Sequence, residues 1–347
     1  MTKNVGRRDF IKTAVAGSAA LTFPSGLFSS PGLSLANSGR IGIIGLDTSH
    51  SIAFTRGLNN PDASPEFGGF KVVAAYPKGS NDIKSSVDRI PGYIEDVKKL
   101  GVEIVNSIDE LIAKVDFVLL ETNDGRLHLE QAIPVMKAGK RMFIDKPVAA
   151  SLTDAIAIYR ASKFYNIPVF SSSSLRYIGG AKEIAGGSVG KVLGADVYSP
   201  ATIEKTHPDL FWYGVHGVEA LFTIMGTGCK TVSRTFTPNM DLVTGTWNDD
   251  LIGSFRGIRS GKSGYGGTVF GEKGIAALGP YSGYNPLLVK IIEFFKTGIT
   301  PVSPEETIAI FTFMEAAQES KLKGGIPVST EKVFQKANKK ADKIAFK

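Results

Sequence analysis

Gly45, Thr48 and Ser49 are spaced so that they could bind an anion, within the segment RIGIIGLDTSHSIAFTR of residues 40–56. The isoleucines before Gly45 predict a short buried parallel strand, and Gly45 supplies the sharp turn that ends it. Thr48 or Ser49 can cap the helix predicted to follow. The free amides at such a helix N-terminus are the usual binding place for the pyrophosphate of a dinucleotide.

The glycine fingerprint of this loop is incomplete. Counted as GxGxxG from Gly45, the second glycine is Asp47 and the third is His50. Asp47 would bring a carboxylate near bound phosphates, whereas a protonated His50 could partly offset that charge. An ordinary strand, turn and helix without a nucleotide is the alternative at this point.

The second predicted strand, residues 70–75, ends without the acid that commonly binds the adenosine ribose of NAD. The residues that follow include Tyr76, Lys78 and Ser80. Lys78 and Ser80 could accept a ribose 2′-phosphate, so this turn favours NADP over NAD. The alternative is that these are only polar turn residues.

Polar residues also follow two later strands. The apolar run 115–120 predicts a central strand that ends in Glu121-Thr122-Asn123-Asp124-Gly125, and the strand 141–144 runs into Asp145-Lys146-Pro147. Open parallel sheets bind their ligands at such carboxyl ends. Strands alternate with helices as far as residue 171, which predicts a doubly wound parallel domain over residues 37–171.

The second half of the chain has a different texture. Glycine-rich, strand-like runs predict an open-faced, mostly antiparallel sheet over residues 172–285. One helical insertion, residues 209–225, carries Trp212, His216 and Glu219 at helical spacing. Residues 286–347 predict helices that pack back on both domains. The fold class is therefore α/β, with a second α+β domain.

Composition excludes several kinds of site. The net charge of +7 contains no block of like charge that would suggest nucleic acid. Cys229 is the single cysteine, so no internal disulfide can form. No cluster of histidine, cysteine and carboxylate residues has ligand spacing, so no metal site is expected.

The first 36 residues resemble a twin-arginine signal. Arg7 and Arg8 form the pair, an apolar run follows from residue 13 to residue 23, and Ser34-Leu35-Ala36 predicts cleavage after Ala36. The apolar run is too short to anchor the chain in a bilayer. We expect export in folded form to the periplasm, which favours a cofactor already in place.

The mature chain resembles the Gfo/Idh/MocA oxidoreductases, the family of glucose-fructose oxidoreductase and inositol dehydrogenase. The resemblance rests on RIGIIG, VDFVLLETNDGRLHLEQAIPVMKAGKRMFIDKPVAASLTDA, GVHGVEALFTIMG, GTVFGEKG and EAAQESKLKGGIPV. It implies a nucleotide-binding domain and an open-faced sheet with the substrate between them.

The resemblance also implies roles for individual residues. Lys146 would lie between nicotinamide and substrate, with Asp145 close to the cofactor and Pro147 holding the turn. His216 would be a general acid–base, with Glu219 one helical turn further on. The reaction would be hydride transfer from a sugar-type carbinol carbon to nicotinamide while a base takes the hydroxyl proton.

Other matched positions carry alternatives. Trp212 replaces an acid of the family and could stack on a sugar. Arg176 and Tyr177 match a substrate-facing place, or form a salt bridge at the domain junction; His207 could face the substrate. The residues expected at the cofactor, with His128 ordering its loop, are Gly45, Asp47, Thr48, Ser49, His50, Tyr76, Lys78, Ser80, Thr122, Asn123, His128, Asp145, Lys146 and Pro147. Those expected at the substrate are Lys146, Arg176, Tyr177, His207, Trp212, His216 and Glu219.

Three functions are consistent with these features. The first is an NAD(P)-dependent oxidoreductase that acts on a hydroxyl of a sugar, polyol or glycoside. The second is a glycosidase that oxidises its sugar transiently with a bound NAD. The third is a non-catalytic sugar-binding descendant, for which Asp47, His50 and Trp212 are the evidence. In each case the resemblance implies a homo-oligomer formed through the open sheet face.

Overall fold

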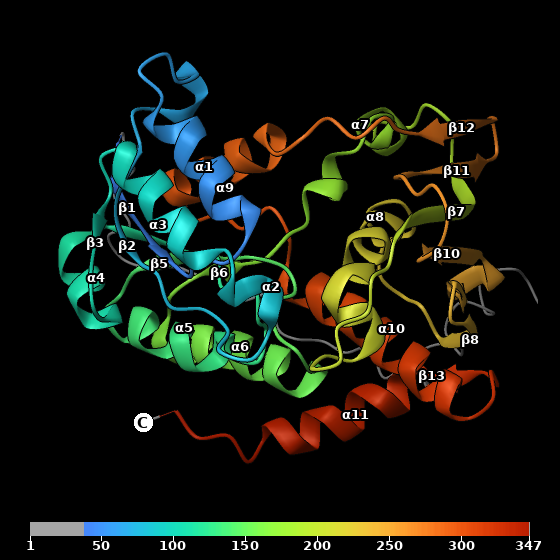
Figure 1. The fold of residues 1–347 in the computed structure, drawn as a ribbon. Coiled ribbons are helices and arrows are strands. Elements are labelled where there is room, and N and C mark those ends of the chain that lie inside the picture. The colour runs from blue at the N-terminus through green and yellow to red at the C-terminus, as the bar shows by residue number, and fades with distance from the viewer. Residues whose placement is uncertain (1–37, 347) are drawn as a thin grey trace, which may run out of the picture. The chain divides into compact units, whose positions relative to one another are not determined.

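The structure is a computed structural model that describes residues 38–346, and these belong to one compact unit. The predicted twin-arginine signal lies outside the described residues. Two β-sheets organise the unit (Figure 1). Within the described residues, no helix is both long enough and apolar enough to cross a membrane.

The first sheet is parallel throughout and has the strand order β3-β2-β1-β4-β5-β6. Its strands are β1 (Arg40–Ile44), β2 (Lys71–Tyr76), β3 (Glu103–Ile104), β4 (Phe117–Leu120), β5 (Arg141–Ile144) and β6 (Val169–Phe170). The central strands β4 and β5 are buried along their whole length, as their apolar sequences predict. The predicted doubly wound parallel sheet is therefore confirmed.

Helices cover both faces of this sheet. They are α1 (Ser49–Asn59), α2 (Lys84–Val87), α3 (Ile90–Lys99), α4 (Ile108–Lys114), α5 (His128–Lys137) and α6 (Leu152–Tyr165). One core joins the sheet to α4, α5 and α6. The opposite core joins it to α1, α3 and a helix from the end of the chain, α9 (Asn285–Thr297). The side chain of Thr48 caps α1 by accepting from the N–H of His50.

The second sheet is mostly antiparallel, as predicted, with the order β12-β11-β7-β10-β9-β8-β13. Only β7 and β10 pair in parallel. The strands are β7 (Val192–Pro200), β8 (Thr231–Thr237), β9 (Met240–Thr246), β10 (Ile252–Ile258), β11 (Gly266–Gly271), β12 (Gly274–Leu278) and β13 (Val328–Ser329). Alternating residues are buried, so one face packs on helices and the other is open.

The remaining helices connect and cover this sheet. They are α7 (Ala181–Ala185), α8 (Val215–Met225), α10 (Pro304–Leu322) and α11 (Thr330–Ala341). Helix α8 packs on β7 and β10, and α10 packs on β8. The predicted helical insertion begins with a π-helical turn, Leu210–Gly214, before α8 starts. This wider turn changes the side-chain spacing that a uniform α-helix would give.

Candidate active site

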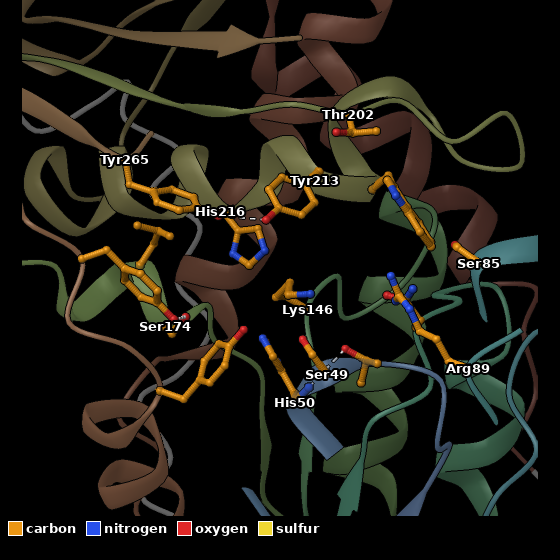
Figure 2. A pocket seen from close by; sticks show the side chains of 16 residues that line it. Ser49, His50, Ser85, Arg89, Lys146, Ser174, Thr202, Tyr213, His216 and Tyr265 are labelled. Atoms are coloured by element: carbon orange, nitrogen blue, oxygen red, sulfur yellow. Dashed lines mark hydrogen bonds between the residues drawn. The ribbon is translucent and has the colours of Figure 1, made fainter. Parts of the chain in front are cut away.

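A cavity of about 400 Å³ opens between the carboxyl ends of the first sheet's strands and helix α8 (Figure 2). Seven of the predicted site residues line it: Thr48, Ser49, His50, Asn123, Lys146, Trp212 and His216. They come from the loops after β1, β4 and β5 and from the start of the helical insertion. The cavity thus has the position and size of a small-molecule site.

Lys146 projects into this cavity from the turn after β5 (Figure 2). Its side chain is buried, and its Nζ lies 3.6 Å from Oδ2 of Asp145. The peptide bond from Lys146 to Pro147 is cis. An ammonium with a single carboxylate neighbour keeps donors free for a substrate oxygen.

Asp145 also holds His50. Nδ1 of His50 lies 2.9 Å from Oδ1 of Asp145, and both residues are buried. Glu121, at the end of β4, completes the group: one ligand-type atom each from His50, Glu121 and Asp145 lie within 4.8 Å of one another. The linear spacing of these residues did not predict this cluster, because its members come from three different strand ends.

His216 lies across the cavity from His50, with Lys146 between them in Figure 2. Its Nδ1 is 2.6 Å from the hydroxyl of Ser173, which also accepts from the N–H of Leu175. Burial, and next the charge of Lys146, hold the pKa of His216 well below its ordinary value. His216 is therefore a neutral imidazole.

Glu219 does not line the cavity and does not contact His216. Its carboxylate accepts from the hydroxyl of Ser172 at 2.7 Å, the N–H of Ser173 at 2.8 Å and Nε of Arg176 at 2.9 Å. Arg176 also donates to Glu306 at 2.6 Å. Glu219 is buried and the Arg176 side chain is only 11% exposed, and their contact corresponds to the salt bridge considered for Arg176.

The altered glycine loop packs its acid inward. Asp47 is fully buried and accepts from the N–H of Ser80 at 3.1 Å and of Asn123 at 2.9 Å. A Cβ at Gly79 would lie 2.1 Å from Oδ2 of Asp47, so only glycine fits beside this carboxylate. Gly45 has φ +90°, and a Cβ there would meet the backbone of Thr122.

The wall beside this loop fits a nicotinamide nucleotide. Thr48 and Ser49 present the N-terminus of α1 to the cavity, and Asp47 is not part of the lining. Arg89, which sequence reasoning missed, lines the cavity there and donates to the carbonyl of Asp47 at 3.4 Å. The guanidinium of Arg89 beside the N-terminus of α1 would suit the negative charge of a diphosphate. Asn123 and Lys146 line the cavity between this end and His216.

In the turn after β2, one side chain predicted to accept a ribose phosphate already has hydrogen-bond partners within the protein. The Ser80 hydroxyl donates to Asp82 at 3.0 Å and accepts from the N–H of Ile83. Tyr76 is half-buried and Lys78 is exposed, and neither residue lines the cavity.

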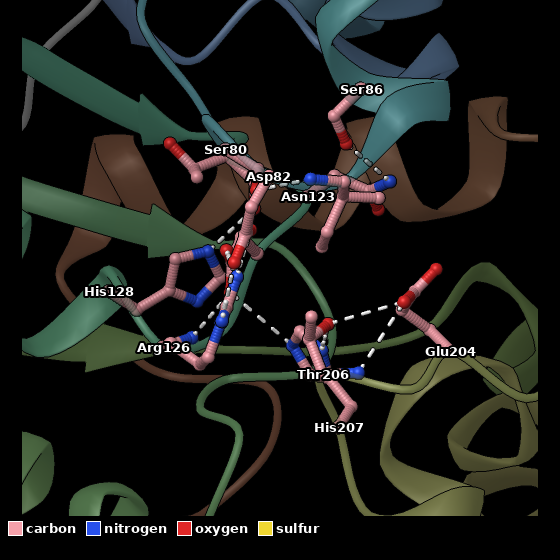
Figure 3. Close-up of polar contacts among 12 residues, drawn as sticks. Ser80, Asp82, Ser86, Asn123, Arg126, His128, Glu204, Thr206 and His207 are labelled. Carbon is pink, nitrogen blue, oxygen red and sulfur yellow. Dashed lines mark hydrogen bonds and ion pairs between the residues drawn. The ribbon is translucent and has the colours of Figure 1, made fainter.

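A chain of ion pairs joins three loops beside the cavity (Figure 3). Arg126 donates to Asp82 through Nη1 at 3.1 Å and to Asp124 through Nε at 2.9 Å. Asp124 lies 3.5 Å from Nε2 of His207, which belongs to the loop before α8. We call these four residues the clasp. His207 is therefore a member of the clasp and is not part of the cavity lining.

Other predicted residues support the loops. His128 bonds the carbonyl of Thr122 through Nε2 at 2.6 Å and that of Val148 through Nδ1 at 3.2 Å. Tyr177 is half-buried outside the cavity lining, and burial raises its pKa to about 12.

An aromatic wall was missed by sequence reasoning. Four tyrosines line the cavity with Trp212: Tyr213, Tyr265, Tyr281 and Tyr284. The hydroxyls of Tyr213 and Tyr265 are 2.8 Å apart, and that of Tyr281 is 2.9 Å from the hydroxyl of Ser174. No short motif could have found them, because they come from separate segments. The other missed lining residues are Ser85, Ser174, Leu175 and Thr202.

Comparisons with known proteins agree with this architecture. Residues 40–170 match the family model GFO_IDH_MocA, described as an oxidoreductase family with an NAD-binding Rossmann fold. An uncharacterized oxidoreductase of Streptococcus pneumoniae is 27% identical over 156 residues, which span 40% of this chain and 42% of that protein.

Solved structures extend the likeness to the second sheet. A probable dehydrogenase from Thermotoga maritima has a TM-score of 0.70 at 21% identity, covering 85% of this chain and 99% of its own. Scyllo-inositol dehydrogenase from Lactobacillus casei, solved with NAD(H) and scyllo-inositol, has a TM-score of 0.67 at 16% identity, covering 85% and 99%. Myo-inositol 2-dehydrogenase from Lactobacillus plantarum has a TM-score of 0.67 at 17% sequence identity, and the match covers 84% of this chain and 99% of that protein. These likenesses show the fold.

Proposed function

We propose a function from one finding: residues 40–170 match the model of an oxidoreductase family with an NAD-binding Rossmann fold. The protein transfers a hydride between a nicotinamide nucleotide and a hydroxyl-bearing carbon of a sugar, polyol or glycoside. The observation that carries this proposal is Lys146, whose ammonium enters the cavity beside the nucleotide wall and faces His216.

The nucleotide would be held by the N-terminus of α1, Arg89 and Asn123, with its nicotinamide toward Lys146. When bound, the nicotinamide supplies the hydride acceptor or donor. We propose NAD or NADP without preference. The predicted preference for NADP rested on Lys78 and Ser80. Because the Ser80 hydroxyl already donates to Asp82, Lys78 is the one predicted contact left for a ribose 2′-phosphate, and the preference has less support.

The chain's own residues would act on the substrate hydroxyl. Lys146 donates a hydrogen bond to the reacting oxygen and stabilises its developing negative charge. Nδ1 of His216 is 2.6 Å from the Ser173 hydroxyl, which leaves Nε2 to bond a second substrate oxygen.

The aromatic wall supports a cyclic polyhydroxylated substrate. The carbon face of such a ring packs on aromatic side chains, while its hydroxyls need hydrogen-bond partners. Trp212 and the four tyrosines provide both surfaces and hydroxyls around the cavity.

The first test is the release of small molecules from denatured, purified protein, with mass spectrometry for NAD and NADP. Added nucleotides are titrated if none is released. We expect bound nucleotide or micromolar binding, and reduction of the nucleotide by a polyol or sugar. Release of the aglycone from a chromogenic glycoside without net reduction would identify the redox glycosidase instead. Sugar affinity without any nucleotide affinity would overturn both enzyme functions.

We also propose export by the twin-arginine route to the periplasm, based on Arg7, Arg8 and the segment that follows. Fractionation of cells that express the full chain tests this. Replacing the pair by Arg7→Lys and Arg8→Lys should retain the protein inside, whereas Lys12→Arg should not.

We propose a homo-oligomer that forms through the open face of the second sheet. This face exposes large apolar side chains on neighbouring strands: Leu193, Tyr198, Leu242, Ile252, Phe270 and Ile275. Light scattering should show a mass above one chain that falls in the Ile252→Lys variant. Ile299→Lys is the matched control, because Ile299 is as exposed but lies after α9.

A further inference from the structure

His50 is the cavity histidine that has a carboxylate partner. Its Nδ1 lies 2.9 Å from Oδ1 of Asp145, whereas the side-chain partner of His216 is the hydroxyl of Ser173. A carboxylate that accepts the Nδ1 proton fixes the tautomer and stabilises the imidazolium, as in hydrolase triads. A proton gained by His50 is therefore compensated, and one gained by His216 is not.

The packing around His50 fixes its ring. It contacts the ring of Tyr284 at 4.6 Å between centroids and the ring of Phe54 at 5.5 Å. The side chain also lines the cavity on the same wall as Lys146 (Figure 2). With Nδ1 committed to Asp145, the nitrogen left for a ligand is Nε2.

Glu121 explains how Asp145 can stay charged. Within residues 38–346, both oxygens of Glu121 and Oδ2 of Asp145 are buried without a hydrogen-bond partner. Two adjacent buried carboxylates do not both ionise at low cost. Burial and the charge of Asp145 raise the pKa of Glu121 well above its ordinary value. A protonated Glu121 is uncharged, so it does not repel the negative charge of Asp145.

We propose that His50 is a second acid–base residue of this site, held by Asp145, and that Glu121 is a positioning residue beside them. The inference rests on the proposed function. As the substrate C–H bond gives its hydride to the nicotinamide, the O–H bond gives its proton to Nε2 of His50, which becomes an imidazolium. Substrate is oxidised, nucleotide is reduced, and the reverse reaction returns the proton.

The charged groups around His50 fit this assignment. Asp145 bonds its Nδ1, Glu121 lies close to both residues, Lys146 and His216 line the same cavity, and the ring of Tyr284 packs on the imidazole. In this assignment Lys146 donates to the reacting oxygen, while His50 takes the proton. Both side chains lie beside the carboxylate of Asp145, which would stabilise the imidazolium that forms.

The test compares His50→Gln, Asp145→Asn and Glu121→Gln, with Asp109→Asn on the exposed side of α4 as control. In the oxidation direction, His50→Gln should lose about 10²–10⁴ of kcat, with nucleotide affinity unchanged. Glu121→Gln should keep kcat, because the amide is uncharged and has nearly the same shape as a protonated carboxyl group. Asp109→Asn should match the native enzyme.

A second readout does not need activity. The proton between Nδ1 of His50 and Asp145 should give a low-field proton NMR signal that is absent in His50→Gln and shifted in Asp145→Asn. Unchanged turnover and pH profile in His50→Gln, with nucleotide bound, would overturn the role of His50 alone. A stoichiometric divalent metal that is lost in Glu121→Gln would overturn the protonated state of Glu121. Absence of nucleotide binding would instead overturn the proposed function.

Discussion

Asp47 accepts a hydrogen bond from the backbone N–H of Asn123 at 2.9 Å, which ties the loop after β1 to the loop after β4. The same carboxylate accepts from the N–H of Ser80 after β2. One side chain thus connects the carboxyl ends of three adjacent strands. Asp47, which replaces the second glycine of the fingerprint, therefore holds together the loops beside the proposed nucleotide site.

Asp47→Ala should therefore reduce stability. It leaves two buried amides without an acceptor, at about 1–3 kcal/mol for each unsatisfied group. Urea unfolding would measure this loss, and Asp62→Ala, at an exposed position, is the control. Equal stability of the two variants would show that solvent reaches these amides.

Glu121→Gln should change how stability depends on pH. The folded pKa of Glu121 is raised, so the folded state keeps a proton that the unfolded state releases above about pH 4.5. The native protein therefore loses free energy of unfolding as pH rises toward the folded pKa, by up to about 1.4 kcal/mol per pH unit. The amide of the variant has no proton to release, so in urea titrations its free energy of unfolding should rise relative to that of the native protein as pH increases above about 4.5. A constant difference between the two proteins would contradict a raised pKa.

Lys146→Ala should abolish turnover with little effect on folding. Loss of the ammonium removes the donor to the reacting oxygen, and we expect kcat to fall by about 10²–10⁴. Turnover, nucleotide titration and thermal melting would be measured together. Lys163→Ala, at an exposed position near the end of α6, should behave like the native enzyme. Normal turnover by the Lys146 variant would refute the proposed mechanism.

Arg126→Gln should speed the release of nucleotide. Arg126 joins Asp82 to Asp124, and its side chain is 36% exposed. Dissolved salt screens ion pairs that are open to solvent, so the ion pairs of the clasp should weaken at high ionic strength even in the native protein. Stopped-flow displacement would give the dissociation rate, which we expect to rise several-fold at low salt and less at high salt. Arg160→Gln, in an ion pair with Asp342 far along the sequence, is the control.

Arg176→Ala should act on stability more than on substrate affinity. It leaves Glu219 buried without its cation, at about 3–5 kcal/mol. Urea unfolding and KM separate the two roles considered for this residue. A large rise in KM with unchanged stability would restore the substrate-facing role.

The sequence predicted the fold well because its signals are local. The strand ends at Glu121 and Asp145 and the cap at Thr48 depend on a few neighbouring residues, and each lies where the pattern indicated. The relation between His216 and Glu219 was not predictable in this way. Helical spacing puts them on one side of α8, but Ser173 and Arg176, from a distant loop, take their polar atoms.

The cavity contained more than the motifs indicated. Arg89 and the four tyrosines have no spacing signal, because they meet only when the two sheets are in place. The group formed by His50, Glu121 and Asp145 is a product of strand order, since β1, β4 and β5 are adjacent in the sheet but far apart in the chain. A search for motifs along the sequence cannot find a site whose residues come from strands that are neighbours only in the folded sheet.

Helix α9 has a consequence for biosynthesis. Leu287, Ile291 and Phe295 fill the core on the α1 face of the first sheet, against strands made at the start of translation. The ribosome must therefore synthesise the whole stretch from β7 to β12 before that core can close. Until then the apolar residues of this face lack their cover, and exposed apolar surface of this kind promotes aggregation during folding. The first sheet is thus encoded early in the chain, but one of its two cores is completed by a helix encoded much later.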